Sequence, residues 1–146
     1  MSGFQFSPDA IIAAAKAVDG LEDFPDDSHR EPLERLLWSL ANEAQLNQVG
    51  AAVLQQRMVD ILATRLRVAE FLKLYPEILD EKIEAPLVIV GLPRTGTTML
   101  HRTIAADHRM YSPAWYEVRF PCPALDWDFT TEGDQRIGEA KAEMQA

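Results

Sequence analysis

Two glycines, Gly91 and Gly96, enclose a short loop that contains Arg94 and Thr95, and two further threonines follow at positions 97–98. These residue types suit the binding of an anion. Successive N–H groups of such a loop and of the helical turn after it point to one place, where the helix dipole also favours negative charge. The threonine hydroxyls add further donors. The pattern predicts a cradle for a phosphate or a similar group.

The elements on either side of the loop must position it. Four apolar residues, Leu87–Val90, precede Gly91, and three of them are β-branched. Such a run predicts a strand buried on both faces, which is typical of a parallel sheet. A helix is expected from Thr97 to about Ala106. We therefore expect an α/β fold with a P-loop-like parallel sheet core, incomplete in this chain, after an N-terminal helical region.

The loop differs from a nucleoside-triphosphate loop in the place of its cation. Gly91 and Gly96 have the spacing of the G-x-x-x-x-G-K-[ST] pattern, but Thr97 stands where that pattern has Lys. In kinases and ATPases the Lys reaches the phosphates and the next hydroxyl holds Mg²⁺. Arg94 is instead expected to neutralise charge on the breaking bond without a metal. A P-loop kinase or NTPase-like protein and a non-catalytic fragment stay as alternatives.

The stretch G-L-P-R-T-G-T-T-M-L, residues 91–100, resembles the 5′-phosphosulfate loop of sulfotransferases that use 3′-phosphoadenosine 5′-phosphosulfate (PAPS). The flanking residues Ala85-Pro86, His101, Trp115-Tyr116-Glu117 and Pro121-Cys122-Pro123 are similar to the bacterial branch of that family. The resemblance implies transfer of a sulfuryl group from PAPS, without a metal, to a hydroxyl or amine of an unknown acceptor, which is a small molecule, a glycan or a lipid. It also implies the donor-binding residues: Pro93, Arg94, Thr95, Gly96, Thr97 and Thr98.

The reaction also needs a base for the acceptor proton. We expect Arg94 and Glu117 to be catalytic, with Glu117 after a second short strand at 110–112 and therefore beside the carboxyl edge of the sheet. Branches of the family place a catalytic Glu in this region, and relatives often have Trp directly before it, where this chain has Tyr116. His101, His108 or a residue beyond Ala146 are the other candidates.

Composition limits the class of protein. The chain has 146 residues, a net charge of −9 and one cysteine. An acidic protein is a poor partner for nucleic acid. A single cysteine fits a reducing compartment, and we expect a cytoplasmic protein. No apolar run reaches the roughly 18 residues that cross a bilayer, the N-terminus lacks the pattern of a signal peptide, and the histidines lack zinc-type spacing.

Local signals predict three helices in the first half of the chain. Ser7 is expected to cap the first helix, with Pro8 at its first position, and Gly20 to end it. Ser28–Glu31 fits a capping box for the second helix. Gly50 is expected to separate that helix from a third, at about Ala51–Leu74.

The acidic, proline-flanked segment 76–86 is the expected boundary between two parts. Residues 1–84 form the helical region, and residues 85–146 begin a P-loop-like sulfotransferase domain. A last helix is expected from Thr131 to Met144. One strong strand cannot make a sheet alone. We therefore expect the chain to be the N-terminal part of a longer protein, with the family's 3′-phosphate motif further along.

Overall fold

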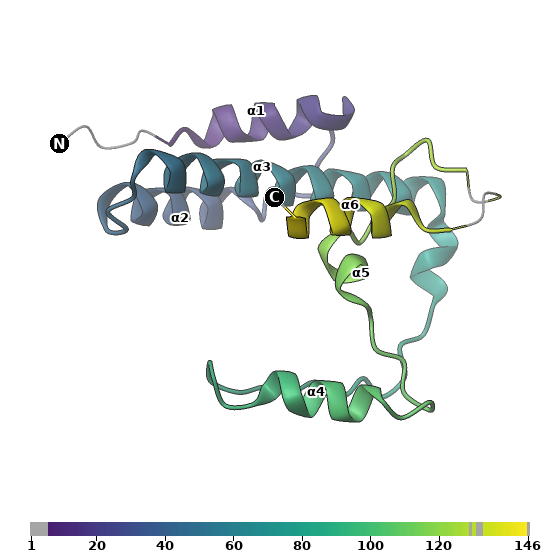
Figure 1. Ribbon diagram of the computed structural model, residues 1–146. Coiled ribbons are helices and arrows are strands. Elements are labelled where there is room, and N and C mark those ends of the chain that lie inside the picture. Colours follow the sequence, from purple (N-terminus) through teal and green to yellow (C-terminus); the bar gives the residue numbers. More distant parts are fainter. Residues whose placement is uncertain (1–5, 129, 131–132, 146) are drawn as a thin grey trace.

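The computed structural model describes residues 6–128, 130 and 133–145, and within them all regular structure is helical (Figure 1). Helices α1, α2 and α3 lie side by side, α5 and α6 lie against each other, and α4 lies apart from them. The helices are α1 (Pro8–Asp19), α2 (Arg30–Asn42), α3 (Gln48–Leu74), the 3₁₀ helix η1 (Pro76–Asp80), α4 (Thr97–Ala105), α5 (Trp115–Arg119) and α6 (Gln135–Gln145).

Helix α1 forms as its sequence predicts. The Ser7 hydroxyl accepts the N–H of Ala10 at 3.3 Å, Pro8 is the first helical residue, and Gly20 ends the helix with a φ of 68°. A left-handed residue at this place satisfies the last carbonyls, and glycine adopts it without steric cost. The side chains of Ile11 and Ala15 are buried.

Two predicted boundaries are wrong. The capping box at Ser28–Glu31 does not form, because α2 begins at Arg30 with His29 before it and no side-chain cap. The hydroxyl of Ser28 instead accepts a hydrogen bond from Arg65 at 2.8 Å. Gly50 does not mark the start of the third helix either. Asn47 caps α3 by accepting the Gly50 N–H at 2.7 Å, so the helix begins before the glycine.

The core lies between α1, α2 and α3. The apolar faces of the three helices meet there, and partly buried residues such as Phe24 and Met58 pack around them. An ion pair adds to this contact, because the Arg67 guanidinium holds the Asp19 carboxylate with two hydrogen bonds, of 2.6 and 3.1 Å. The buried members of the cluster are Ile11, Ala15, Leu33, Leu37, Val59, Leu62 and Ala63.

The predicted parallel sheet core is wrong. No strand is present in the described part of the chain, neither at residues 87–90 nor at the second expected position, 110–112. A strand requires a neighbour for its N–H and C=O groups, and the run 87–90 has none. Three of its four side chains are correspondingly exposed, with Val90 87% exposed, and Ile89 is half-buried. Among the described residues after 85, regular structure is limited to the helices α4, α5 and α6.

The second half of the chain is attached to α3 through charged contacts. Arg119 of α5 lies between Asp60 of α3, at 3.6 Å, and Glu143 of α6, at 2.9 Å, and its side chain is only 14% exposed. Helix α6 begins at Gln135, and the expected start of the last helix at 131–132 lies outside the described residues. These contacts fix α5, which carries Glu117, beside the N-terminal helices.

Candidate functional site

The predicted anion loop closes tightly on Gly91. A Cβ added at Gly91 would lie 2.8 Å from Cγ2 of Thr97 and 2.9 Å from Oγ1 of Thr95. The hydroxyl of Thr95 also donates a hydrogen bond of 2.7 Å to the carbonyl of Leu92, across the loop. The structure thus brings together the two ends of the predicted loop, and only glycine leaves room at position 91.

Arg94 has an unusual backbone and an open side chain. Its φ is 68°, in the left-handed region, which costs a residue with a Cβ roughly 1–2 kcal/mol. The side chain is exposed, and its guanidinium makes no hydrogen bond or ion pair with the described residues. Strained residues of this kind concentrate at functional sites. The guanidinium is therefore free to meet an anion at the loop.

Helix α4 begins directly after the loop. Gly96 precedes it with a φ of 88°, and the first helical hydrogen bond from this turn runs from the Leu100 N–H to the Gly96 carbonyl at 3.0 Å. The N–H groups of Thr97, Thr98 and Met99 therefore have no acceptor within the helix. Together with the helix dipole, they make this end of α4 favourable for negative charge.

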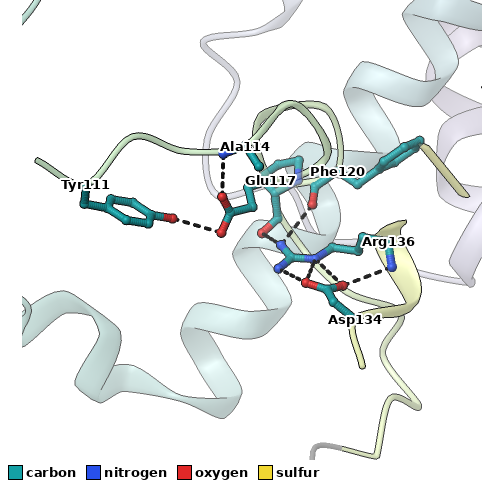
Figure 2. A network of polar contacts seen from close by, with 7 residues as sticks. Tyr111, Ala114, Glu117, Phe120, Asp134 and Arg136 are labelled. Carbon is teal, nitrogen blue, oxygen red and sulfur yellow. Dashed lines mark hydrogen bonds and ion pairs between the residues drawn. The ribbon is translucent and has the colours of Figure 1, made fainter. Parts of the chain in front are cut away.

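Glu117, the predicted base, is held within its own segment (Figure 2). Its Oε2 accepts the N–H of Ala114 at 2.6 Å, which caps α5, and its Oε1 accepts the hydroxyl of Tyr111 at 2.9 Å. The Ala114 N–H and the Tyr111 hydroxyl hold the pKa of the Glu117 carboxyl below its ordinary value of 4.5. In return, the bond to Glu117 raises the pKa of the Tyr111 phenol above 10.0. Glu117 is thus ionised at neutral pH.

The ionised carboxylate of Glu117 can still accept further hydrogen bonds. Each oxygen has a second lone pair, so Glu117 has room to accept a hydrogen bond from a hydroxyl of an acceptor. No hydrogen bond or ion pair joins it to residues 93–98 in the part of the chain that the structure describes. In Figure 1 the loop lies at one end of α4, and the path to α5 leaves from the other.

The two other candidate bases in this chain, His101 and His108, differ in their contacts and in their exposure to solvent. Nε2 of His101, on α4, lies 2.8 Å from Oγ of Ser112. The side chain of His108 is 93% exposed, and its Nδ1 lies 3.8 Å from the carboxylate of Asp107. Sequence reasoning did not find the pairing of His101 with Ser112. The two residues lie on opposite sides of the turn that follows α4, so neither the helix period nor the strand period relates their positions, and the pattern gives no sign of the contact.

Arg136 fixes the chain that follows α5 (Figure 2). It holds the Asp134 carboxylate and donates to the carbonyls of Phe120 at 3.1 Å and Pro121 at 3.4 Å. Its guanidinium also lies over the rings of Tyr116 and Trp127, at 5.5 and 5.8 Å. The hydrogen bonds from Arg136 lower the pKa of Asp134. These contacts are structural, and they hold α5 at its C-terminal end.

An apolar cavity of about 520 Å³ lies beyond α5. Phe71 and Tyr75, whose rings are stacked at 5.9 Å, form part of its wall, and Pro121–Pro123 forms another part. Burial raises the pKa of the Cys122 thiol in this wall. The cavity lies at the end of the segment that carries Glu117, four residues after it.

Neither a metal centre nor a membrane span is found in the part of the chain that the structure describes. No three His, Cys, Asp or Glu side chains there are grouped so as to hold a metal ion. None of the helices there combines the length and apolar character that crossing a bilayer requires.

The chain resembles known proteins in its sequence and in its fold. Residues 86–146 match the model of the sulfotransferase family. The crystal structure of sulfotransferase STF1 from Mycobacterium tuberculosis H37Rv is similar over 96% of the chain, with a TM-score of 0.81 and 31% sequence identity. The chain spans 39% of the length of that protein's chain. No curated protein was found to match. The family match over the loop and α4, together with this structural similarity, supports assignment of the chain to the sulfotransferase family.

Proposed function

We propose that the protein transfers a sulfuryl group from PAPS to a hydroxyl or amine of an acceptor. The observation that carries the proposal is the free, exposed guanidinium of Arg94 in a loop that matches the sulfotransferase family. The unpaired N–H groups at the start of α4 suit the phosphosulfate end of this donor, and the close approach of Thr95 and Thr97 to Gly91 fixes the shape of the loop beside them. The structural relative is itself named a sulfotransferase.

The donor supplies an activated sulfur, bonded through oxygen to the 5′-phosphate. In the reaction the acceptor oxygen bonds to that sulfur, the bond from sulfur to the phosphate oxygen breaks, and 3′,5′-ADP leaves with the electron pair. Arg94 and the N–H groups of residues 97–98 then stabilise the charge that grows on the leaving oxygen. Removal of one such donor typically lowers the rate about 10²- to 10³-fold.

Glu117 is the proposed base. Its carboxylate is ionised at neutral pH because the Ala114 N–H and the Tyr111 hydroxyl stabilise the charge, which lowers the pKa of Glu117. A carboxylate with a low pKa is a weak base. It suits a reaction in which the acceptor proton leaves late, after the bond to the phosphate has largely broken. Within this proposal, residues 1–84 form a helical region that supports the sulfotransferase domain beginning at 85.

The test is binding of 3′,5′-ADP to the full-length protein in EDTA, measured by calorimetry. Arg94→Ala is expected to weaken binding about 10- to 100-fold, because a charged hydrogen bond contributes about 1.5–3 kcal/mol. Arg35→Ala is the matched control, since Arg35 is exposed on the outside of α2, where it pairs with Glu31. Equal affinity in the Arg94 variant, or Mg²⁺-dependent turnover of ATP, would refute the proposal.

A further inference from the structure

Two neighbouring residues, Tyr111 and Ser112, connect the loop helix with the proposed base. The Tyr111 hydroxyl donates to Oε1 of Glu117 at 2.9 Å. The Ser112 hydroxyl lies 2.8 Å from Nε2 of His101, on α4. One side chain therefore contacts α5, and the next contacts the helix that begins at the anion loop.

The link between these two contacts is short and stiff. Only Pro113 and Ala114 separate Ser112 from the first residue of α5. The ring of Pro113 fixes its φ, and the Ala114 N–H is already bound to Glu117 at 2.6 Å. A segment with so little freedom transmits the position of Ser112 to α5. His101 is itself on a helix that starts at Thr97, so its place relative to the loop is fixed.

We propose that His101 is a positioning residue, which holds Tyr111 and Glu117 at a set place relative to the anion loop by anchoring Ser112. This inference rests on the proposed function, because it concerns the distance between the donor loop and the base. His101 does not contact the reacting atoms in this role. This role gives a reason for the two adjacent contacts: His101 binds the Ser112 hydroxyl, and Glu117 accepts a hydrogen bond from Tyr111, the residue before it.

The protonation state of Glu117 reports directly on this arrangement. Three groups lower the pKa of the Glu117 carboxyl: the Ala114 N–H has the largest effect, the Tyr111 hydroxyl the next, and the charge of Arg136 a smaller one, while burial and the charge of Asp134 act in the opposite direction. If Tyr111 loses its anchor, the pKa of Glu117 rises part of the way to its ordinary value. Tyr111→Phe removes the hydroxyl alone and gives the size of the full effect.

The experiment is NMR titration of the Glu117 side-chain carboxyl carbon in the full-length protein. His101→Ala and Ser112→Ala are expected to raise the pKa of Glu117 in the direction of Tyr111→Phe. The double variant, with both His101→Ala and Ser112→Ala, is expected to show the same pKa of Glu117 as either single variant. Ser112→Thr keeps the hydroxyl and is expected to restore the original pKa. His108→Ala is the control imidazole, exposed to solvent and without a contact to this segment.

A second readout separates positioning from folding. His101→Ala is expected to lower kcat of sulfuryl transfer up to about 100-fold, the cost of a small misplacement, while the affinity for 3′,5′-ADP stays the same. A pKa of Glu117 that is unchanged in both the His101 and Ser112 variants would overturn the inference. If the wild-type protein neither binds 3′,5′-ADP nor transfers sulfate, the proposed function fails, and the titration still decides whether His101 positions Glu117.

Discussion

The hydroxyl of Tyr111 donates a hydrogen bond of 2.9 Å to Oε1 of Glu117, six residues further along the chain. The bond requires a protonated phenol and favours an ionised carboxylate. It therefore stabilises the two residues in opposite protonation states and widens the pH range over which both persist. Its dependence on pH follows from the direction of each pKa shift.

We predict that this hydrogen bond stabilises the fold over a wide interval of pH. The pKa of Glu117 is lowered in the folded protein. Its contribution to the stability of the fold is therefore fully present above pH 4.5 and is lost as the pH falls through the pKa of the folded state. The pKa of Tyr111 is raised, so its contribution is present below 10.0 and is lost as the pH rises through the folded value. A double-mutant cycle of Tyr111→Phe and Glu117→Gln measures it. Coupling that grows in acid would contradict the prediction.

Gly91→Ala is predicted to abolish the loop geometry without unfolding the helices. The new Cβ would lie 2.8 Å from Cγ2 of Thr97, whose β-branched side chain has little freedom to move. The expected result is loss of 3′,5′-ADP binding with an unchanged thermal unfolding midpoint. Gly138→Ala is the matched control, since nothing lies within 4 Å of its added Cβ. In α6 that change is expected to stabilise by about 0.5–1 kcal/mol. Normal nucleotide binding by the Gly91 variant would exclude this account of the loop.

Leu66→Ala is predicted to destabilise the protein by about 2–5 kcal/mol, because the side chain is 1% exposed and its removal leaves a cavity. Leu74→Ala, on the same helix, is expected to change stability by about 0.5 kcal/mol or less, since Leu74 is 54% exposed. Urea unfolding followed by circular dichroism measures both. Similar losses in the two variants would show that α3 does not form the centre of the core.

Asn47→Ala is predicted to cost about 1 kcal/mol, the usual contribution of a helix cap. Asn47 accepts the Gly50 N–H at 2.7 Å and so begins the longest helix of the chain. Asn47→Asp keeps an acceptor at the same place, next to the positive end of the helix dipole, and is expected to retain the wild-type stability. Equal loss in both variants would argue for a role other than capping.

Local signals predicted local structure well. Ser7, Pro8 and Gly20 delimit α1 as expected, since each acts on its own few neighbours. The helix from Thr97 also formed where it was expected, directly after the loop. These features depend on the chain within one or two turns, and the sequence contains that information.

Contacts outside the local pattern explain two of the failures. Ser28 has the spacing of a capping box, but its N–H binds Asp26 and its hydroxyl binds Arg65 of α3. The run 87–90 has the composition of a buried strand, but no partner segment lies beside it in the described chain. The apolar composition of a segment indicates that it could form a buried strand. Whether the strand forms depends on a neighbouring segment with which it can pair.

The sequence predicted the local shape of the loop, but it did not predict the contacts that connect α4 with the segment before α5. The residues at 91–98 follow a compact pattern, and the structure brings Gly91 to Thr95 and Thr97. The roles of Arg94 and Glu117 stay predictions for the experiments above. The anchoring of Ser112 by His101 depends on how the turn after α4 folds back, which no spacing rule reveals.

The left-handed backbone of Arg94 has a consequence for attempts to engineer this protein. At that φ a glycine or an asparagine has less backbone strain than an arginine. A screen for thermal stability alone will therefore favour the replacement of Arg94. The winners of such a screen would melt at a higher temperature and would have lost the positive charge that we expect the nucleotide to need. Selection for thermal tolerance in this chain therefore has to be paired with a nucleotide-binding readout at every round.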